Sequence, residues 1–220
     1  MVNYEIEPAM LLPHVPAGTE LDIWNGRCFV SLVGFLFLNT RVLGLPVPFH
    51  RNFEEVNLRF YVRRKSSEGW RRGVVFVKEI VPRWAIASIA RWVYNENYDS
   101  MPMRHSIDGD VFEYEWIYRD ALCSFAVTRR GEPSLPAPGS DIEFVTEHYW
   151  GYCKRRGGGS VEYKVEHPSW RVWRAHHAEV GIPAVQLCGA EFAGALGGPA
   201  ISALLAEGSA VSVHRAVRIA

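Results

Sequence analysis

The sequence predicts an α+β protein in which antiparallel β-structure predominates. Short apolar or alternating runs recur along most of the chain, with few helices between them, a pattern typical of a sheet closed or nearly closed into a barrel. Asn25-Gly26 and Asp108-Gly109 each join two such runs, as hairpin turns do. The aromatic content of 13%, with eight tryptophans, favours β-rich structure or an aromatic-lined cavity.

The predicted elements follow from these local patterns. We expect strands, in chain order, at residues 20–24, 27–38, 55–64, 73–80, 111–118, 122–128, 149–154, 160–166, 170–175 and 210–219. A proline followed by apolar residues at helical spacing predicts a short helix at 84–93. Ser140 with Glu143 three residues later forms a capping box, which predicts a helix near 141–148. The Ala- and Gly-rich stretch 184–205 predicts one or two more.

Three stretches are predicted to be loops because they contain turn-forming residues. These are residues 41–52, which we expect beside a cavity mouth, 65–72 and the proline-rich 131–139. The last is the best candidate for a mobile edge.

Composition excludes some classes of protein. Lys+Arg and Asp+Glu both number 24, so the chain lacks the broad positive charge on which nucleic-acid binders rely. The four cysteines are isolated among apolar neighbours, as buried free thiols are. The first residues contain two glutamates and no basic stretch, and no uncharged apolar run reaches membrane-spanning length. We therefore expect a soluble cytoplasmic protein that does not bind nucleic acid or membranes, and a homodimer through an exposed edge strand.

One predicted strand carries an unusual set of polar groups. From Glu55 on, apolar and polar residues alternate strictly, so the two kinds fall on opposite faces of the strand. The apolar face carries Val56, Leu58, Phe60 and Val62. The other face carries a carboxylate, an amide, two guanidiniums and a phenol, from Glu55, Asn57, Arg59, Tyr61 and Arg63.

Three interpretations of this polar face remain open. If the apolar face packs against a helix or a second layer, the polar face must line the barrel interior. There Arg59 would hold a carboxylate or phosphate by a bidentate fork, and Glu55 would act as a base or as its counter-ion. The alternatives are a buried Glu–Arg network that only fixes the fold, and a solvated face.

Lys78 is the one lysine in an otherwise apolar strand, VVFVKEI. A desolvated lysine beside another cation can act as an amine nucleophile. Pairing at the barrel rim with Glu79 or another carboxylate is the favoured interpretation. Only one of the two side chains can point inward, because strand neighbours face opposite sides.

Metal binding and cofactors find little support in the sequence. The histidines do not form an H-x-x-x-H or HExxH motif, and no glycine-rich phosphate loop precedes a helix. We therefore predict that the protein needs neither a metal nor a cofactor, and that its partner is a small molecule.

Several long segments resemble a family of uncharacterised bacterial proteins typified by YqjF, also called DUF2071. They are listed here in order: WNGRCFVSLVGFLFLNTRVLGLPVPFHRNFEEVNLRFYVRR, GVVFVKEIVPRWAIASIARWVYNENYDSMPMRH, FVTEHYWGYC and LLAEGSAVSVHR. The resemblance spans nearly the whole chain, which implies a single domain over 1–220. That family is similar in fold to acetoacetate decarboxylase, which implies a cone-shaped antiparallel barrel with an interior site and a few short peripheral helices.

The resemblance to the decarboxylase transfers only in part. Its aromatic-x-glutamate motif is matched by Phe53-Glu54-Glu55, which implies that Glu55 is the equivalent carboxylate. The segment that carries its two lysines corresponds to NENYDSMPMRH, where Met103 and Arg104 stand instead. Methionine cannot form an imine and arginine stays protonated, so decarboxylation by that mechanism is not expected.

The same segment supplies candidate pocket residues. Asn97, Tyr98 and Arg104 become pocket-wall candidates through the resemblance, with ordinary loop capping as the alternative. Three functions therefore stay open. The first is binding of a small anionic organic ligand, with acid–base catalysis by Glu55. The second is an amine enzyme using Lys78 on a carbonyl compound, and the third is a non-catalytic interaction domain.

Overall fold

The computed structural model describes residues 1–42, 45–46, 51–82, 98–155 and 157–220. The predicted helix at 84–93 and the candidate Asn97 lie outside the described residues, as does part of the predicted loop 41–52. Within the described residues, no helix is both long and apolar enough to cross a membrane.

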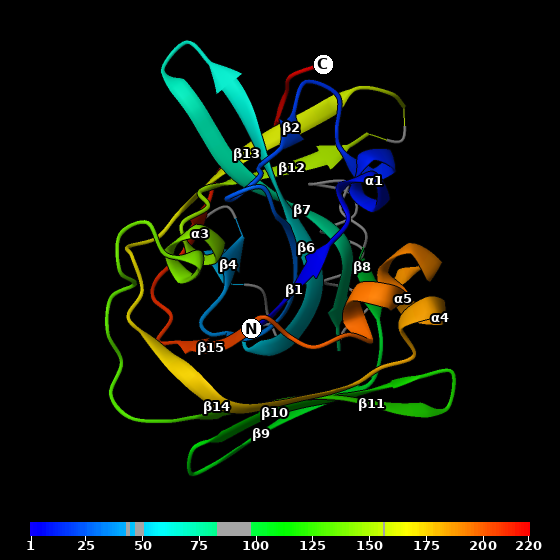
Figure 1. Ribbon diagram of the computed structural model, residues 1–220, viewed down its shortest axis with the longest axis vertical. Coiled ribbons are helices and arrows are strands. Elements are labelled where there is room, and N and C mark those ends of the chain that lie inside the picture. Colours follow the sequence, from blue (N-terminus) through cyan, green and yellow to red (C-terminus); the bar gives the residue numbers. More distant parts are fainter. Residues whose placement is uncertain (43–44, 47–50, 83–97, 156) are drawn as a thin grey trace.

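A mixed, mainly antiparallel sheet dominates the described chain (Figure 1). Its strands are β1 Val2–Ile6, β2 Glu20–Leu21, β3 Cys28–Phe37, β6 Phe53–Ser66, β7 Gly69–Val81, β8 Tyr98–Ser100, β9 Met103–Asp108, β10 Val111–Tyr118, β11 Ala121–Arg129, β12 Trp150–Lys154, β13 Ser160–Glu166, β14 Val172–Gly181, β15 Ser202–Ala206, β16 Ser212–Val213 and β17 Val217–Arg218. A separate pair is formed by β4 Arg41–Val42 and β5 Leu45–Pro46. The helices are short: α1 Pro8–Leu11, a 3₁₀ turn at Leu12–His14, α3 Asp141–Thr146, α4 Ala184–Cys188 and α5 Ala190–Leu196.

The sheet runs in the order β16-β13-β12-β7-β6-β3-β1-β15-β14-β11-β10-β9. Most neighbours are antiparallel, but β7 pairs in parallel with both β12 and β8. The end strands β16 and β9 do not pair with each other among the described residues, so the predicted closed barrel is not confirmed. Instead β9 approaches β6 through side chains, where His105 Nδ1 lies 2.6 Å from Glu54 Oε1.

The main core lies between two parts of the curved sheet. Figure 1 shows β9, β10, β11 and β14 as a layer beneath β1, β6 and β7, with α4 and α5 at one flank and α3 at the other. The apolar face of β6 packs into this core with Trp116, Cys123 and Phe125 of β10 and β11. Gly34 of β3 marks a close approach of the two parts, because a Cβ there would lie 2.7 Å from the Tyr114 ring. The two parts of the sheet therefore pack tightly against each other.

A second, smaller core lies on the opposite face of β3, β6 and β7. Helix α3 covers this face with Ile142, Phe144 and Val145, which pack against Phe29 and Tyr61. The helix starts as predicted, because the Ser140 hydroxyl accepts a hydrogen bond from the Glu143 N–H at 3.1 Å. The Glu143 carboxylate, however, accepts from the Gly139 N–H rather than completing the box on Ser140.

The predicted hairpin turns are mostly confirmed. Asn25 and Gly26 have φ values of 49° and 79°, as the Asn-Gly signal requires. Asp108-Gly109 joins β9 to β10. The predicted turn at 65–72 is confirmed but much shorter, at Ser67 and Glu68, because β6 and β7 continue until Ser66 pairs with Gly69. The end of this hairpin carries charged residues, so the pattern of apolar residues does not show that the strands continue there.

The chain ends differ most from the prediction. β1 was not predicted, yet it lies at the centre of the sheet between β3 and β15. The predicted closing strand at 210–219 is reduced to the two-residue strands β16 and β17, which pair with β13. The two small helices predicted in 184–205 are confirmed as α4 and α5.

A glycine lets β12 approach β7. A Cβ on buried Gly73 would lie 2.4 Å from the Trp150 carbonyl oxygen, a backbone atom that cannot rotate away. We expect Gly73→Ala to destabilise the protein by about 2 kcal/mol through overpacking. Gly157→Ala is the control, because a Cβ there meets open space. Urea unfolding of both variants measures the difference, and equal midpoints would refute the expected clash.

Candidate functional site

Both faces of β6 are buried, so the polar face is neither solvated nor open to bulk water. Glu55, Asn57 and Tyr61 are 1%, 2% and 2% exposed, and they share the face on which Tyr61 packs against α3. The apolar face does pack against a second layer, as the first interpretation requires. The interior behind this apolar face, however, is filled by the main hydrophobic core. The polar residues lie on the other side of the strand.

Three adjacent strands bring the acidic residues together. Asn57 of β6 lies opposite Glu79 of β7, and Glu79 pairs in turn with Tyr98 of β8. Glu55 accepts two hydrogen bonds, from Asn57 Nδ2 and from the Tyr98 hydroxyl, both at 3.0 Å. Glu79 is also 1% exposed. Two buried carboxyl groups therefore flank one phenol.

The Glu55 carboxyl group is strongly perturbed by its burial. Burial raises its pKa from 4.5 to about 7, against the opposing effects of the Asn57 and Tyr98 hydrogen bonds and of the Arg59 charge. No cation lies within ion-pair distance of this carboxyl group among the described residues. Glu55 therefore changes protonation state near neutral pH, which is the property required of a general acid or base.

Tyr98 explains how two buried carboxyl groups coexist. Burial, followed by the charges of Glu55 and Glu79, raises its pKa well above the usual value, so the phenol keeps its proton. Glu79 also hydrogen-bonds the Tyr98 side chain. The Tyr98 hydroxyl has one proton and can donate it to one carboxylate. Hydrogen bonding in the cluster is therefore best satisfied when either Glu55 or Glu79 is itself protonated.

Arg59 and Tyr61 contact the last turn of α3. Arg59 Nη2 donates to the Val145 carbonyl at 3.2 Å, and the Tyr61 hydroxyl lies 3.4 Å from the same oxygen. The Arg59 Nε–H is buried without a hydrogen-bond acceptor in the described structure. Tyr61 also bonds to Ser31 at 2.6 Å. Arg59 thus keeps donor capacity, while Tyr61 is committed to the fold.

Lys78 lies on the other face of the sheet from Glu55. β7 carries one extra residue opposite the Leu58–Arg59 step, and beyond this bulge Lys78 points toward the main core. Its ammonium forms an ion pair with Asp99, beside a cavity of about 10 Å³ that Trp116 and Cys188 also line. Only Glu79 faces the Glu55 side, as strand geometry demanded.

The remaining candidates are not brought to this cluster. Arg104 is exposed on the outer face of β9, where it pairs with Glu115 at 2.5 Å. Its neighbour Met103 packs against the main core. Neither approaches Glu55, because the register with β10 fixes which β9 side chains point outward.

A second polar cluster on the α3 side was not predicted. Asp22 accepts from Arg72 Nε at 2.6 Å and lies 3.3 Å from His148 Nε2. Burial lowers the pKa of His148 to about 4, so the imidazole is neutral at pH 7. Its Nδ1 is buried without a partner in the described structure. Three isolated polar residues far apart in sequence gave no local signal of this contact.

The described residues contain no group of three or more His, Cys, Asp or Glu side chains placed to hold a metal ion. The four cysteines are free thiols, three of them buried.

Comparisons with known proteins give the family and the fold. Residues 1–209 match the DUF2071 family of uncharacterized conserved proteins. The chain is 32% identical over 184 residues to the uncharacterized protein YqjF of Bacillus subtilis, covering 82% of this chain and 73% of that protein.

Solved structures resemble it at low sequence identity. Acetoacetate decarboxylase from Legionella pneumophila aligns with a TM-score of 0.66 at 12% identity, over 100% of this chain and 83% of the other. The enduracididine biosynthesis enzyme MppR, solved in complex with pyruvate, aligns with a TM-score of 0.62 at 11% identity, over 98% and 81%. These likenesses establish an acetoacetate decarboxylase-like fold.

Proposed function

Because this chain belongs to the DUF2071 family and has an acetoacetate decarboxylase-like fold, we propose that it binds a small carboxylated carbonyl compound and moves a proton next to the carbonyl group. The observation that carries the proposal is the buried Glu55 carboxyl group, whose pKa of about 7 suits proton transfer at neutral pH.

The roles follow from the contacts. Glu55 takes the proton from the carbon beside the carbonyl and returns it, so the carboxylate and the carboxylic acid alternate. Tyr98 and Asn57 hold the Glu55 oxygens in place by hydrogen bonds. Arg59 supplies a positive charge and a free Nε–H donor for an anionic group on the ligand.

The class of ligand is supported by the structural neighbours. One of them is named for acetoacetate and another was solved with pyruvate, and both compounds carry a carbonyl and a carboxylate. The decarboxylase mechanism itself is not proposed, because Met103 and Arg104 stand in the segment where its lysines lie.

The amine alternative has weaker support. Lys78 points to the opposite face from Glu55, and its side-chain nitrogen is engaged in an ion pair with Asp99. A non-catalytic interaction domain leaves the buried Glu55–Tyr98–Glu79 arrangement without a purpose beyond packing.

The test measures, by proton NMR in D₂O, the rate at which the methyl protons of pyruvate exchange for deuterium. A second series uses acetoacetate. We expect exchange by the wild-type protein and a loss of at least about 100-fold in Glu55→Gln. Glu54→Gln is the matched control, since this neighbour points to the opposite face and contacts His105.

Two outcomes would overturn the proposal: full exchange by Glu55→Gln, or no exchange above buffer by the wild type with either compound. Borohydride trapping, with the adduct detected by intact-protein mass, distinguishes the Lys78 amine alternative from proton transfer by Glu55. An adduct that disappears in Lys78→Met would assign the chemistry to the amine instead.

A further inference from the structure

A cavity of about 290 Å³ lies apart from the Glu55 cluster. It is enclosed by the proline-rich loop between β11 and α3, by the first turn of α3 and by β14. Two of its lining residues, Ile142 and Val172, are apolar and only 8% and 4% exposed, so they form an apolar floor. A space of this size is at the small end of ligand sites.

The loop that forms one wall is fixed at several points. Ser134 and Val172 exchange two backbone hydrogen bonds, at 3.0 and 2.8 Å. Arg171 donates to the Pro133 carbonyl at 2.8 Å, and the Gly139 N–H bonds to Glu143 at 2.7 Å. The sequence predicted a mobile edge here, but these bonds hold the wall in place, so the cavity is formed before any ligand arrives.

Two guanidinium groups line the cavity without a partner. The side chains of Arg130 and Arg174 make no ion pair or hydrogen bond within the described part of the chain, whereas those of the adjacent Arg129 and Arg171 are paired with Asp110 and Glu207. Glu132 is the one carboxylate in the lining, so the wall carries a net positive charge.

Hydroxyl groups complete the polar side. Ser134 and Ser140 both line the cavity, and Ser140 uses only its oxygen lone pair to cap α3, which leaves its proton available. Guanidinium and hydroxyl donors on one side and aliphatic side chains on the other match an amphipathic anion.

We propose that this cavity is a second ligand site, which binds a small organic anion with a compact apolar body. Arg130 and Arg174 bind the anionic group, and Ile142 and Val172 contact the body. This site does not depend on proton transfer at Glu55, because the two share no lining residue.

The test uses ¹⁹F NMR line broadening with 4-fluorobenzoate and 4-fluorophenyl phosphate as anionic probes, and 4-fluorobenzyl alcohol as the neutral one. We expect at least one anion to bind saturably and the alcohol to bind at least about tenfold more weakly. The double variant Arg130→Met/Arg174→Met should weaken anion binding by about tenfold or more.

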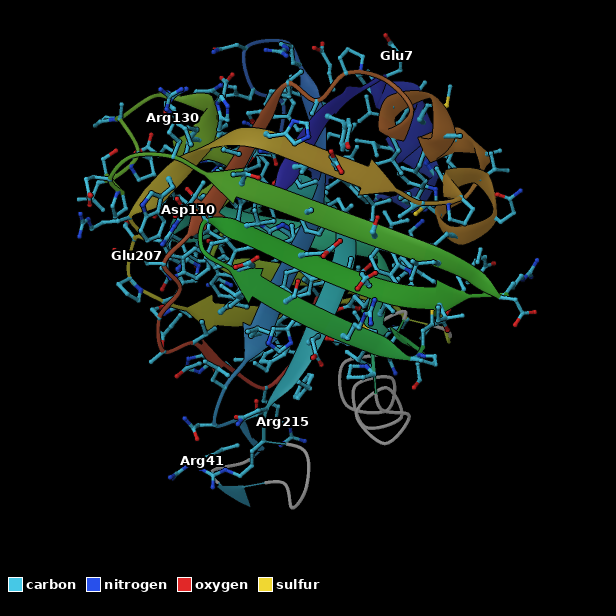
Figure 2. All side chains as sticks on the ribbon, turned by 90° about the horizontal axis from the view of Figure 1, so that it is seen from below. Glu7, Arg41, Asp110, Arg130, Glu207 and Arg215 are labelled. Atoms are coloured by element: carbon cyan, nitrogen blue, oxygen red, sulfur yellow. The ribbon has the colours of Figure 1, made fainter. Side chains whose placement is uncertain are left out.

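The controls separate local from general charge effects. Arg215→Met removes one exposed charge that lies well away from Arg130 (Figure 2) and should leave binding unchanged. Leu135→Glu keeps both arginines but adds a negative charge to the exposed rim, and should weaken binding. Thermal melting verifies that each variant is folded.

The proposal fails if neither anion binds the wild type saturably, if the double variant binds as the wild type does, or if the alcohol binds as well as the anions. The double variant should also retain pyruvate exchange, so failure of this site and failure of the proposed reaction are read from different assays.

Discussion

Replacing Glu55 with glutamine is expected to stabilise the protein above pH 7 while abolishing proton transfer. Burial raises the folded-state pKa to about 7 from 4.5, so the folded state binds the Glu55 proton more tightly than the unfolded state does. The stability contributed by that proton is complete below pH 4.5 and is lost as the pH rises through 7. Above this range the buried charge costs about 3 kcal/mol, which a neutral amide avoids.

Urea unfolding at several pH values between 4.5 and 8.5 measures this effect. The variant should equal the wild type at the acid end and exceed it increasingly toward pH 8. Glu54→Gln should show no such pH-dependent gain, because that carboxylate pairs with His105. A constant difference between Glu55→Gln and wild type at every pH would contradict the raised pKa.

Asp22→Ala is expected to destabilise the protein by about 3 kcal/mol at pH 7, because it removes the counter-ion of a partly buried guanidinium. Burial alone would raise the Asp22 pKa, but hydrogen bonds from His148 and Arg72 lower it below its usual value. Without this carboxylate the Arg72 charge remains over the Phe144 ring, 4.6 Å from its centroid, and no other described residue forms an ion pair with it.

The matched control is Glu20→Ala on the short strand β2, which ends directly before Asp22. Glu20 pairs with Arg63 at 2.7 Å, but its side chain is 53% exposed, so the loss should stay below about 1 kcal/mol. Urea unfolding at pH 7 compares the two variants. Equal losses would show that burial of the Asp22 network adds nothing.

The same network limits acid stability. Burial lowers the pKa of His148 to about 4 from 6.5, so the unfolded state binds this proton first as the pH falls. Stability from the neutral imidazole is present above pH 6.5 and is lost as the pH falls toward 4.

The sequence predicted β6 well and its surroundings less well. Strict alternation identified two faces correctly, since every member of the apolar face is buried in one core. Alternation cannot say what covers the second face, and here α3, some 80 residues later, covers it. Tyr98 was found through the family resemblance and does contact Glu55.

Other parts of the site depend on contacts that no local pattern encodes. Glu79 was considered only as a partner for Lys78, whereas cross-strand pairing places it beside Asn57. The bulge opposite Leu58–Arg59 changes which β7 side chains face the core. The sequence VVFVKEI contains no residue type that predicts a bulge. Arg104 points outward because of its register with β10, which the linear sequence leaves undetermined.

The placement of β15 has a consequence for how the chain reaches its native state. β15 separates the strands β16 to β1 from the strands β14 to β9 in the sheet order, so it joins two parts that are otherwise connected through packing. Its partner β1 precedes it by most of the described chain, so Val2 meets Ala203 only after all the residues between them have been synthesised. Until then one edge of β1 stays open to other strands, and such late, long-range pairing is slow. We expect the pairing of β1 with β15 to form late in folding, with this edge of β1 as the point most vulnerable to aggregation.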